Sequence, residues 1–484
     1  MDQWKIWEMN PCGDGFVNNT GYVFSLCKGG LVKALSAWAV AFVVAASPLS
    51  AQTLEEAFVA AYLNNPDLQA ARAGLRSTDE GVPQALANWR PDVSVSADVG
   101  ASSVFNSTST VDRKQHRDPK SITLSVTQPL FRGGRTLAAT SGAENDVRAA
   151  RARLLTTEQT VLLSTATAYL DVYRDQAVLD LNINNERVLK RQLEATRDRF
   201  AVGEITRTDV NQAEARLATA VADRIQSEGD LEVSRAAYKK VVGEAIMAKV
   251  KLPVLPTIEA TSVEDAARIA VRRNPDVIAA EFDRKSALDN IDEVWGELLP
   301  EVDVSASLSR SMQSSGEDGR NDTAEIKLNL TVPLYQKGDV YSRLRQSRQQ
   351  AAQRVRLIDS ARRTAVEAAT KAWENVATAG ARVQSLKASI EASVVALEGV
   401  EREAAVGSRT VLDVLDAEQE LLNARVAHVR GQRDESVAIY QLLSAIGKLT
   451  AKELNLPVEM YDPTAHYKKV RERWFGGRSP GGVE

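Results

Sequence analysis

The chain has 484 residues, a formal net charge of −4 and 26% charged residues, and only 5% of its residues are aromatic. Its Arg and Lys residues are interspersed with Asp and Glu, which is typical of solvated helix faces and gives no indication of nucleic-acid binding. Few aromatic residues, many Ala, Arg, Glu and Gln residues and only 15 prolines favour long helices over several compact globular domains.

The N-terminal region, residues 1–51, has the pattern of an extension followed by an export signal. An apolar run over residues 35–46 is followed by small residues ending at Ala51, after which we expect cleavage. Cys12 and Cys27 precede that point, so the mature chain would hold no thiol, which suits an oxidising compartment. No later segment is apolar enough to predict a transmembrane helix. A membrane role would therefore need strands.

The region 52–253 reads as one structural repeat. A helical pattern is stopped at Asn65-Pro66-Asp67, and a second one ends before Pro91. Strict alternation of apolar and polar residues then predicts strands with one apolar and one polar face, and proline-free patterns around Gly203 predict two long helices. The elements predicted after Pro91 are strands at about 92–105 and 121–131 and helices at about 136–202 and 206–243.

The region 254–450 repeats this plan. Asn274-Pro275-Asp276 copies the earlier Asn-Pro-Asp, and V-G-S-R-T-V-L-D-V-L-D at 406–416 copies V-G-E-I-T-R-T-D-V at 202–210. Matching markers in the same order indicate an internal duplication. The predicted elements are strands at about 301–312 and 324–335 and helices at about 339–406 and 411–446. Residues 451–484 are predicted to form a C-terminal segment that is disordered beyond Pro457.

The four predicted strands are too few to close a membrane barrel within one chain. Open strand edges are not tolerated in lipid, and an eight-stranded barrel is filled by its own side chains, so three chains with twelve strands would give a wet lumen. Phe131 and Tyr335, at matched strand ends, would lie at the membrane interface. The alternatives are ordinary strands of a soluble α+β domain, and helices that form a plain coiled coil.

The duplicated helix-strand-strand-helix plan and the two turn sequences closely resemble the TolC family of outer-membrane efflux and secretion channels, from about Leu54 to Lys448. The resemblance implies a mainly α fold with a membrane β-barrel. Three copies would form a 12-stranded outer-membrane β-barrel continuous with a long periplasmic α-helical (coiled-coil) barrel. The implied location is the outer membrane of a Gram-negative bacterium.

The resemblance also implies partners and site residues. The partners are two further copies, outer-membrane lipid, a periplasmic adaptor (membrane fusion) protein and an inner-membrane ABC or RND-type transporter, with no cofactor. Site residues carried over from the family fall into three groups at the helical turns: Asp413 and Asp416 at the pore constriction; Thr208, Asp209, Arg409, Gln192 and Glu401 in closed-state contacts between neighbouring coils; Gly203, Gly407 and Ser408 in the tip turns that meet the adaptor. Without the resemblance, the two aspartates read as a solvated helix face.

No enzyme signature stands out in the chain. His116, His428 and His466 are scattered and lack neighbouring Cys, so they do not have metal-ligand spacing. Gly133-Gly134 lacks the Lys and the following Ser or Thr of a phosphate-binding loop. We predict a channel without catalytic activity that exports cargo through a type I secretion or multidrug efflux system, and the alternative is an exported soluble or surface coiled-coil scaffold. The sequence leaves the cargo open between proteins and small molecules.

Overall fold

The computed structural model describes residues 53–105, 114–246, 249–314 and 319–477. The predicted export signal with both cysteines lies outside the described residues, as do residues 478–484. The first repeat contains these elements: α1 (Leu54–Asn64), α2 (Pro66–Asp79), α3 (Gly81–Ala87), β1 (Asp92–Val99), β2 (Ser102–Phe105), β3 (Lys114–Arg117), β4 (Lys120–Arg132), α4 (Arg135–Ala201) and α5 (Arg207–Val242). The second repeat and the C-terminal segment contain these: α6 (Val263–Arg273), α7 (Pro275–Gly296), β5 (Glu301–Met312), β6 (Arg320–Thr331), α8 (Asp339–Ala405), α9 (Val411–Ala445) and α10 (Ala465–Val470).

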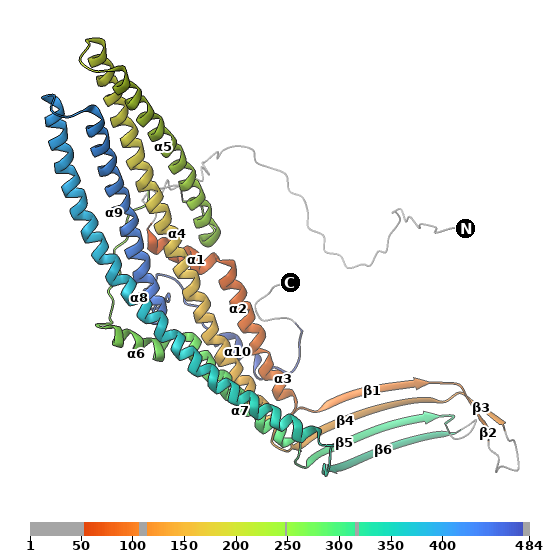
Figure 1. The fold of residues 1–484 in the computed structure, drawn as a ribbon. Coiled ribbons are helices and arrows are strands. Elements are labelled where there is room, and N and C mark those ends of the chain that lie inside the picture. Colours follow the sequence, from red (N-terminus) through yellow and green to blue (C-terminus); the bar gives the residue numbers. More distant parts are fainter. Residues whose placement is uncertain (1–52, 106–113, 247–248, 315–318, 478–484) are drawn as a thin grey trace, which may run out of the picture. The chain divides into compact units, whose positions relative to one another are not determined.

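The two longest helices, α4 and α8, have 67 residues each, which corresponds to about 100 Å at 1.5 Å per residue. Each is followed by an antiparallel partner, so α4 and α5 form a first hairpin and α8 and α9 form a second hairpin beside it (Figure 1). The repeats do not form separate domains, because Leu49–Glu484 clusters as one unit in which α4 packs against both α7 and α9. Within the described residues, no helix combines the length and the apolar character that crossing a membrane requires.

The Asn of each Asn-Pro-Asp marker makes the same two kinds of hydrogen bond in its repeat. The Asn65 side-chain oxygen accepts from the Asp67 backbone N–H at 2.9 Å and so caps α2, while its amide nitrogen donates to Val241 O at 2.8 Å. Asn274 likewise accepts from the Asp276 N–H at 2.9 Å and donates to the last residue of α9 at 3.4 Å. An Asn side chain can serve both ends because it carries an acceptor and two donors. The markers therefore tie the start of each short helix to the end of each returning helix.

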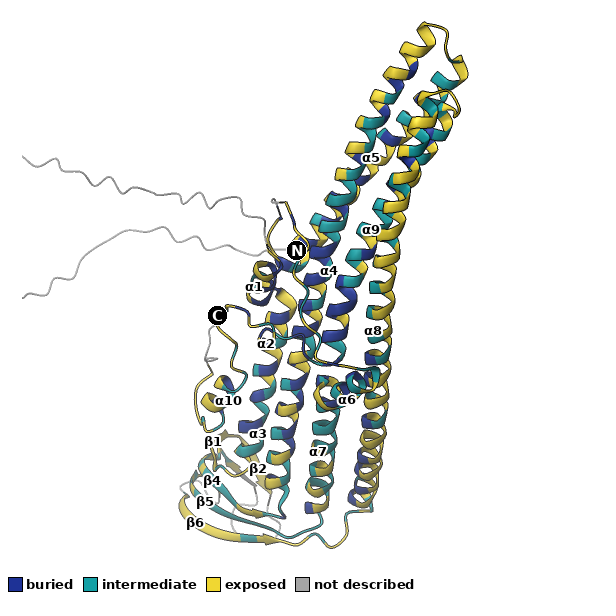
Figure 2. Cartoon of the chain, turned by 90° about the vertical axis from the view of Figure 1, so that its left-hand side faces the viewer, coloured by how far each residue is buried: buried dark blue, intermediate teal, exposed yellow. Residues whose placement is uncertain are grey.

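The main core lies where the short helices meet the long ones. Figure 2 shows buried residues concentrated along the middle of α4 and α9, next to α1, whereas the hairpin tips are largely exposed and the strands are exposed or intermediate. Tyr169 and Tyr238 are among the largest fully buried side chains, and the Tyr169 hydroxyl donates to Lys251 O at 3.0 Å. Burial raises the pKa of both phenols, so both remain neutral in the core.

The strands form an antiparallel sheet in the order β1-β4-β5-β6. The register aligns Val95, Leu124, Leu308 and Ala324 on one face, and Ser94, Ser125, Ser307 and Glu325 on the other. The apolar face is uncovered within the described chain: Val93 is 61% exposed and Ile326 is 80% exposed. The alternation of the sequence is thus present in the structure, although no helix packs on the apolar face (Figure 1).

The structure corrects three details of the sequence analysis. The first predicted strand, at about 92–105, is interrupted at Gly100, whose N–H donates to Pro119 O; its last part forms β2, which pairs with β3 at Lys114–Arg117, where no strand was predicted. The last strand ends at Thr331, so Tyr335 lies beyond it. The C-terminal segment is ordered as far as residue 477, because His466 and Val470, one helical turn apart in α10, are buried.

Candidate functional site at the helical tips

The two hairpin tips are built alike. Gly203 and Gly407 have φ angles of +82° and +81°, a left-handed conformation that ends α4 and α8 and that glycine adopts without strain. A capping box then starts each returning helix. Thr206 and Asp209 cap α5, and in the same arrangement Thr410 and Asp413 cap α9. The sequence V-G-x-x-T-x-x-D-V is therefore repeated because both tips have the same local structure.

The carboxylate of Asp413 accepts hydrogen bonds from Thr410, the N-cap residue of the same helix. Asp413 Oδ2 accepts from the Thr410 backbone N–H at 2.9 Å and from the Thr410 hydroxyl at 2.8 Å. These two hydrogen bonds lower the pKa of Asp413, with a smaller contribution from the positive charge of Arg409. Because both cap donors are neutral, they leave the negative charge of the carboxylate in place.

Asp416 has a different partner, Arg216 of α5. The two side chains form a close ion pair between Arg216 Nη2 and Asp416 Oδ1, which joins the second hairpin to the first. Aligning Gly203 with Gly407 places Gln212 opposite Asp416 and Glu420 opposite Arg216. The shared fold of the tips requires neither charge, so this pair is specific to the contact between the hairpins.

Apolar packing accompanies the ion pair. Leu415 is 2% exposed and lies in a cluster with Leu189, Leu193 and Ala213 of the first hairpin. Val414, on the other side of α9, packs instead against Leu397 of its own hairpin. The first turns of α9 are therefore held on two sides, by α8 and by the first hairpin.

Arg409, one of the other predicted gating residues, bonds within its own hairpin. Arg409 Nε donates to Glu403 Oε2 at 2.9 Å in its own hairpin, and the hydroxyl of Ser408 donates to Glu403 O at 2.9 Å. Among the described residues, no hydrogen bond or ion pair joins Arg409 to Thr208 or Asp209.

Gln192 and Glu401 likewise form no hydrogen bond with each other in the described part of one chain. Glu401 acts instead on Glu418 of α9: burial first, and then the like charge of Glu401, raise the pKa of Glu418. The contacts that Gln192 and Glu401 are predicted to make with a neighbouring copy remain predictions.

The predicted interfacial aromatic side chains are both at the surface. Phe131 lies in β4 opposite Val302, just after the register shift at Pro129, and Tyr335 lies between β6 and α8. Their exposed fractions are 45% and 76%. Neither side chain is needed for a core contact, which leaves both available to an interface.

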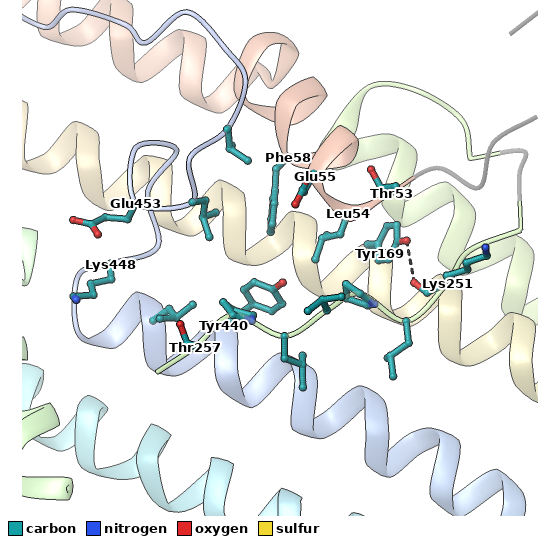
Figure 3. Close-up of a pocket in the computed structure, with 18 of the residues that line it drawn as sticks. Thr53, Leu54, Glu55, Phe58, Tyr169, Lys251, Thr257, Tyr440, Lys448 and Glu453 are labelled. Atoms are coloured by element: carbon teal, nitrogen blue, oxygen red, sulfur yellow. Dashed lines mark hydrogen bonds between the residues drawn. The ribbon is translucent and has the colours of Figure 1, made fainter. Parts of the chain in front are cut away.

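The part of the chain that the structure describes contains no group of three or more His, Cys, Asp or Glu residues arranged to hold a metal ion. A cavity of about 910 Å³ lies between α1, the segment 251–257 and the end of α9 (Figure 3). Leu54, Phe58 and Leu443 supply apolar walls, and the Tyr169–Lys251 hydrogen bond closes one side.

Comparison with known proteins gives consistent matches over most of the chain. The family model described as outer membrane efflux protein matches residues 58–244 and 267–448. The outer membrane efflux protein BepC of Brucella suis is 34% identical over 467 residues, covering 95% of this chain and 99% of BepC. The outer membrane protein TolC of Escherichia coli is 24% identical, covering 84% of each chain. The solved structure of the outer membrane protein VceC from Vibrio cholerae shares the fold, with a TM-score of 0.72 and 22% identity over 81% of this chain and 96% of VceC.

Proposed function

Because the chain belongs to the outer membrane efflux protein family, we propose that it forms a homotrimeric TolC-like channel that exports substrates across the periplasm and the outer membrane. Three sheets would close a 12-stranded barrel in outer-membrane lipid, and the long hairpins would form a helical barrel in the periplasm. A periplasmic adaptor would join the tips to an inner-membrane ABC or RND-type transporter, which would supply the energy.

The observation that carries this proposal is the uncovered apolar face of the sheet. Ile326 is 80% exposed, while Glu325 and Lys327, its neighbours on the opposite face, are charged. The sheet also has two open edges, β1 and β6. Pairing β1 of one copy with β6 of the next would satisfy the edges, put the apolar face toward lipid and put the polar face toward water.

In this assembly the helical tips would form the gate. Asp413 and Asp416 would ring the constriction, where carboxylates attract cations. Arg409 with Thr208 and Asp209, and Gln192 with Glu401, would join neighbouring coils in the closed state. The tip turns, Gly203, Gly407 and Ser408, would meet the adaptor. Phe131 and Tyr335 would lie at the membrane interface.

The sheet's orientation is tested by placing a lysine on each face. Ile326→Lys should prevent trimers from accumulating in the outer membrane, because a lysine facing lipid costs about 2–4 kcal/mol at mid-depth. Ser307→Lys, on the polar face opposite Glu325, should be tolerated. The measurement is the mass of the detergent-extracted protein by light scattering, together with its yield from the outer-membrane fraction. Equal yields of the two variants, or a wild-type protein that is soluble without detergent, would favour the coiled-coil scaffold.

A further inference from the structure

The ion pair between Arg216 and Asp416 joins two parts of the chain that are 200 residues apart, and no local folding rule requires it. Arg216 is on α5, one helical turn beyond Ala213, which packs in the same cluster as Leu415. Asp416 directly follows Leu415. The ion pair therefore lies at the rim of the apolar contact between the hairpins. If α9 moved away from the first hairpin, both the ion pair and the apolar contact would break.

We propose that Arg216 is a positioning and selectivity-determining residue of the gate, which holds Asp416 against the first hairpin and neutralises its charge while the channel is closed. This inference rests on the proposed channel function. The two aspartates then have unequal roles. Asp413 is bonded by neutral donors of Thr410 and keeps its charge, whereas the charge of Asp416 is balanced by a guanidinium.

Opening of the channel changes the net charge of the constriction. In the closed trimer the ring carries the net charge of three carboxylates, because each Asp416 is paired. When α9 separates from the first hairpin, Asp416 is released and the ring gains three further negative charges. Attraction of cations by the constriction should therefore be stronger in the open state than in the closed state.

The geometry also predicts how strongly the pair favours closure. The side chain of Arg216 is 37% exposed and that of Asp416 is 56% exposed, so the pair is partly screened by water. A pair of this kind shifts a two-state equilibrium by up to about fivefold. Three pairs acting together in a trimer would shift it by roughly tenfold or more, since the contributions multiply.

The test is conductance of the purified full mature protein in planar bilayers. Arg216→Gln should raise the resting conductance roughly tenfold and should strengthen block by a trivalent cobalt hexammine ion, because Asp416 becomes unpaired. The charge exchange, Arg216→Asp with Asp416→Arg, should restore the low resting conductance. Arg197→Gln is the matched control, since Arg197 forms an exposed pair with Glu214 within the first hairpin.

The outcomes separate this inference from the proposed function. A conducting wild-type protein whose resting conductance and block are unchanged in Arg216→Gln would overturn the role of Arg216 and leave the channel intact. A charge exchange that behaves like Arg216→Gln would show that the two residues do not act as a pair. A wild-type protein that never conducts would instead reject the channel itself.

Discussion

Gly133→Ala is expected to prevent the folded protein from accumulating, while Gly134→Ala leaves most of it intact. Gly133 lies in the turn from β4 into α4 with a φ of +60°. A Cβ added there would lie 2.2 Å from Gly296 O and 2.9 Å from the Cβ of Leu299. The nearest atom is backbone, so the overlap cannot be relieved by rotating a side chain. The close approach of Gly133 to Gly296 is what lets the start of α4 pack on the end of α7.

Gly134 is a matched control for backbone strain. It has a φ of +78°, and an added Cβ would meet nothing within 4 Å. Alanine at either position carries the left-handed penalty of about 1 kcal/mol, but only Gly133→Ala adds overpacking against backbone, for a total of about 3–4 kcal/mol. The measurement is the yield of each variant in the membrane fraction, together with the guanidinium midpoint of any protein that is recovered. Equal yields and midpoints for the two variants would contradict the close contact with Gly296.

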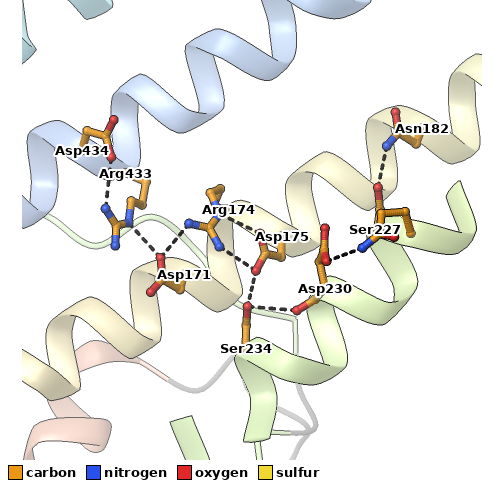
Figure 4. A network of polar contacts seen from close by, with 10 residues as sticks. Asp171, Arg174, Asp175, Asn182, Ser227, Asp230, Ser234, Arg433 and Asp434 are labelled. Carbon is orange, nitrogen blue, oxygen red and sulfur yellow. Dashed lines mark hydrogen bonds and ion pairs between the residues drawn. The ribbon is translucent and has the colours of Figure 1, made fainter. Parts of the chain in front are cut away.

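Arg174→Ala should destabilise the protein more than any exposed arginine substitution. Arg174 donates two hydrogen bonds to Asp175, at 2.6 and 2.8 Å, and one to Asp171 at 2.9 Å (Figure 4). Asp171 also accepts from Arg433 of α9, and Asp175, which is only 8% exposed, also accepts from the hydroxyl of Ser234 on α5. The network thus ties three helices together below the tips. The hydrogen bonds to Asp175 raise the pKa of Arg174 despite its partial burial, so the guanidinium stays charged.

Removal of Arg174 leaves the nearly buried carboxylate of Asp175 without its cation. Breaking a buried pair costs about 3–5 kcal/mol, and partial exposure of this network reduces the expected loss to about 3 kcal/mol. Arg402→Ala serves as the control, because Arg402 is 82% exposed and its pair with Glu398 is worth less than about 0.5 kcal/mol. Both variants are compared by guanidinium unfolding followed by far-ultraviolet circular dichroism. A loss for Arg174→Ala no larger than that for Arg402→Ala would contradict the network's role.

Those features of the fold that follow local rules could be predicted from the sequence. The long helices run at 135–201, 207–242, 339–405 and 411–445, close to their predicted bounds, because glycine turns and Thr-x-x-Asp capping boxes mark their ends. Period-two alternation located the four main strands. Residues Ser102–Phe105 fell within the first predicted strand, but their partner β3 was missed because Lys114–Arg117 is a charged segment without apolar alternation.

The side-chain contacts at the tips could not be predicted in the same way. Asp413 was assigned to the pore from a family resemblance, and the structure gives it a capping role that its spacing from Thr410 already implied. Arg216 was missed because its partner is 200 residues away and no periodicity connects them. A comparison of the two repeats, which places Gln212 opposite Asp416, is the sequence signal that could have identified this site.

The most direct test of the channel itself is the conductance of the purified mature protein in a planar bilayer, beside the double variant Asp413→Ala, Asp416→Ala. The wild-type protein should give small, cation-selective openings that a multivalent cation blocks, and the double variant should lose both the selectivity and the block. Absence of conductance, from protein that remains soluble without detergent, would contradict the channel and leave the coiled-coil scaffold as the better account.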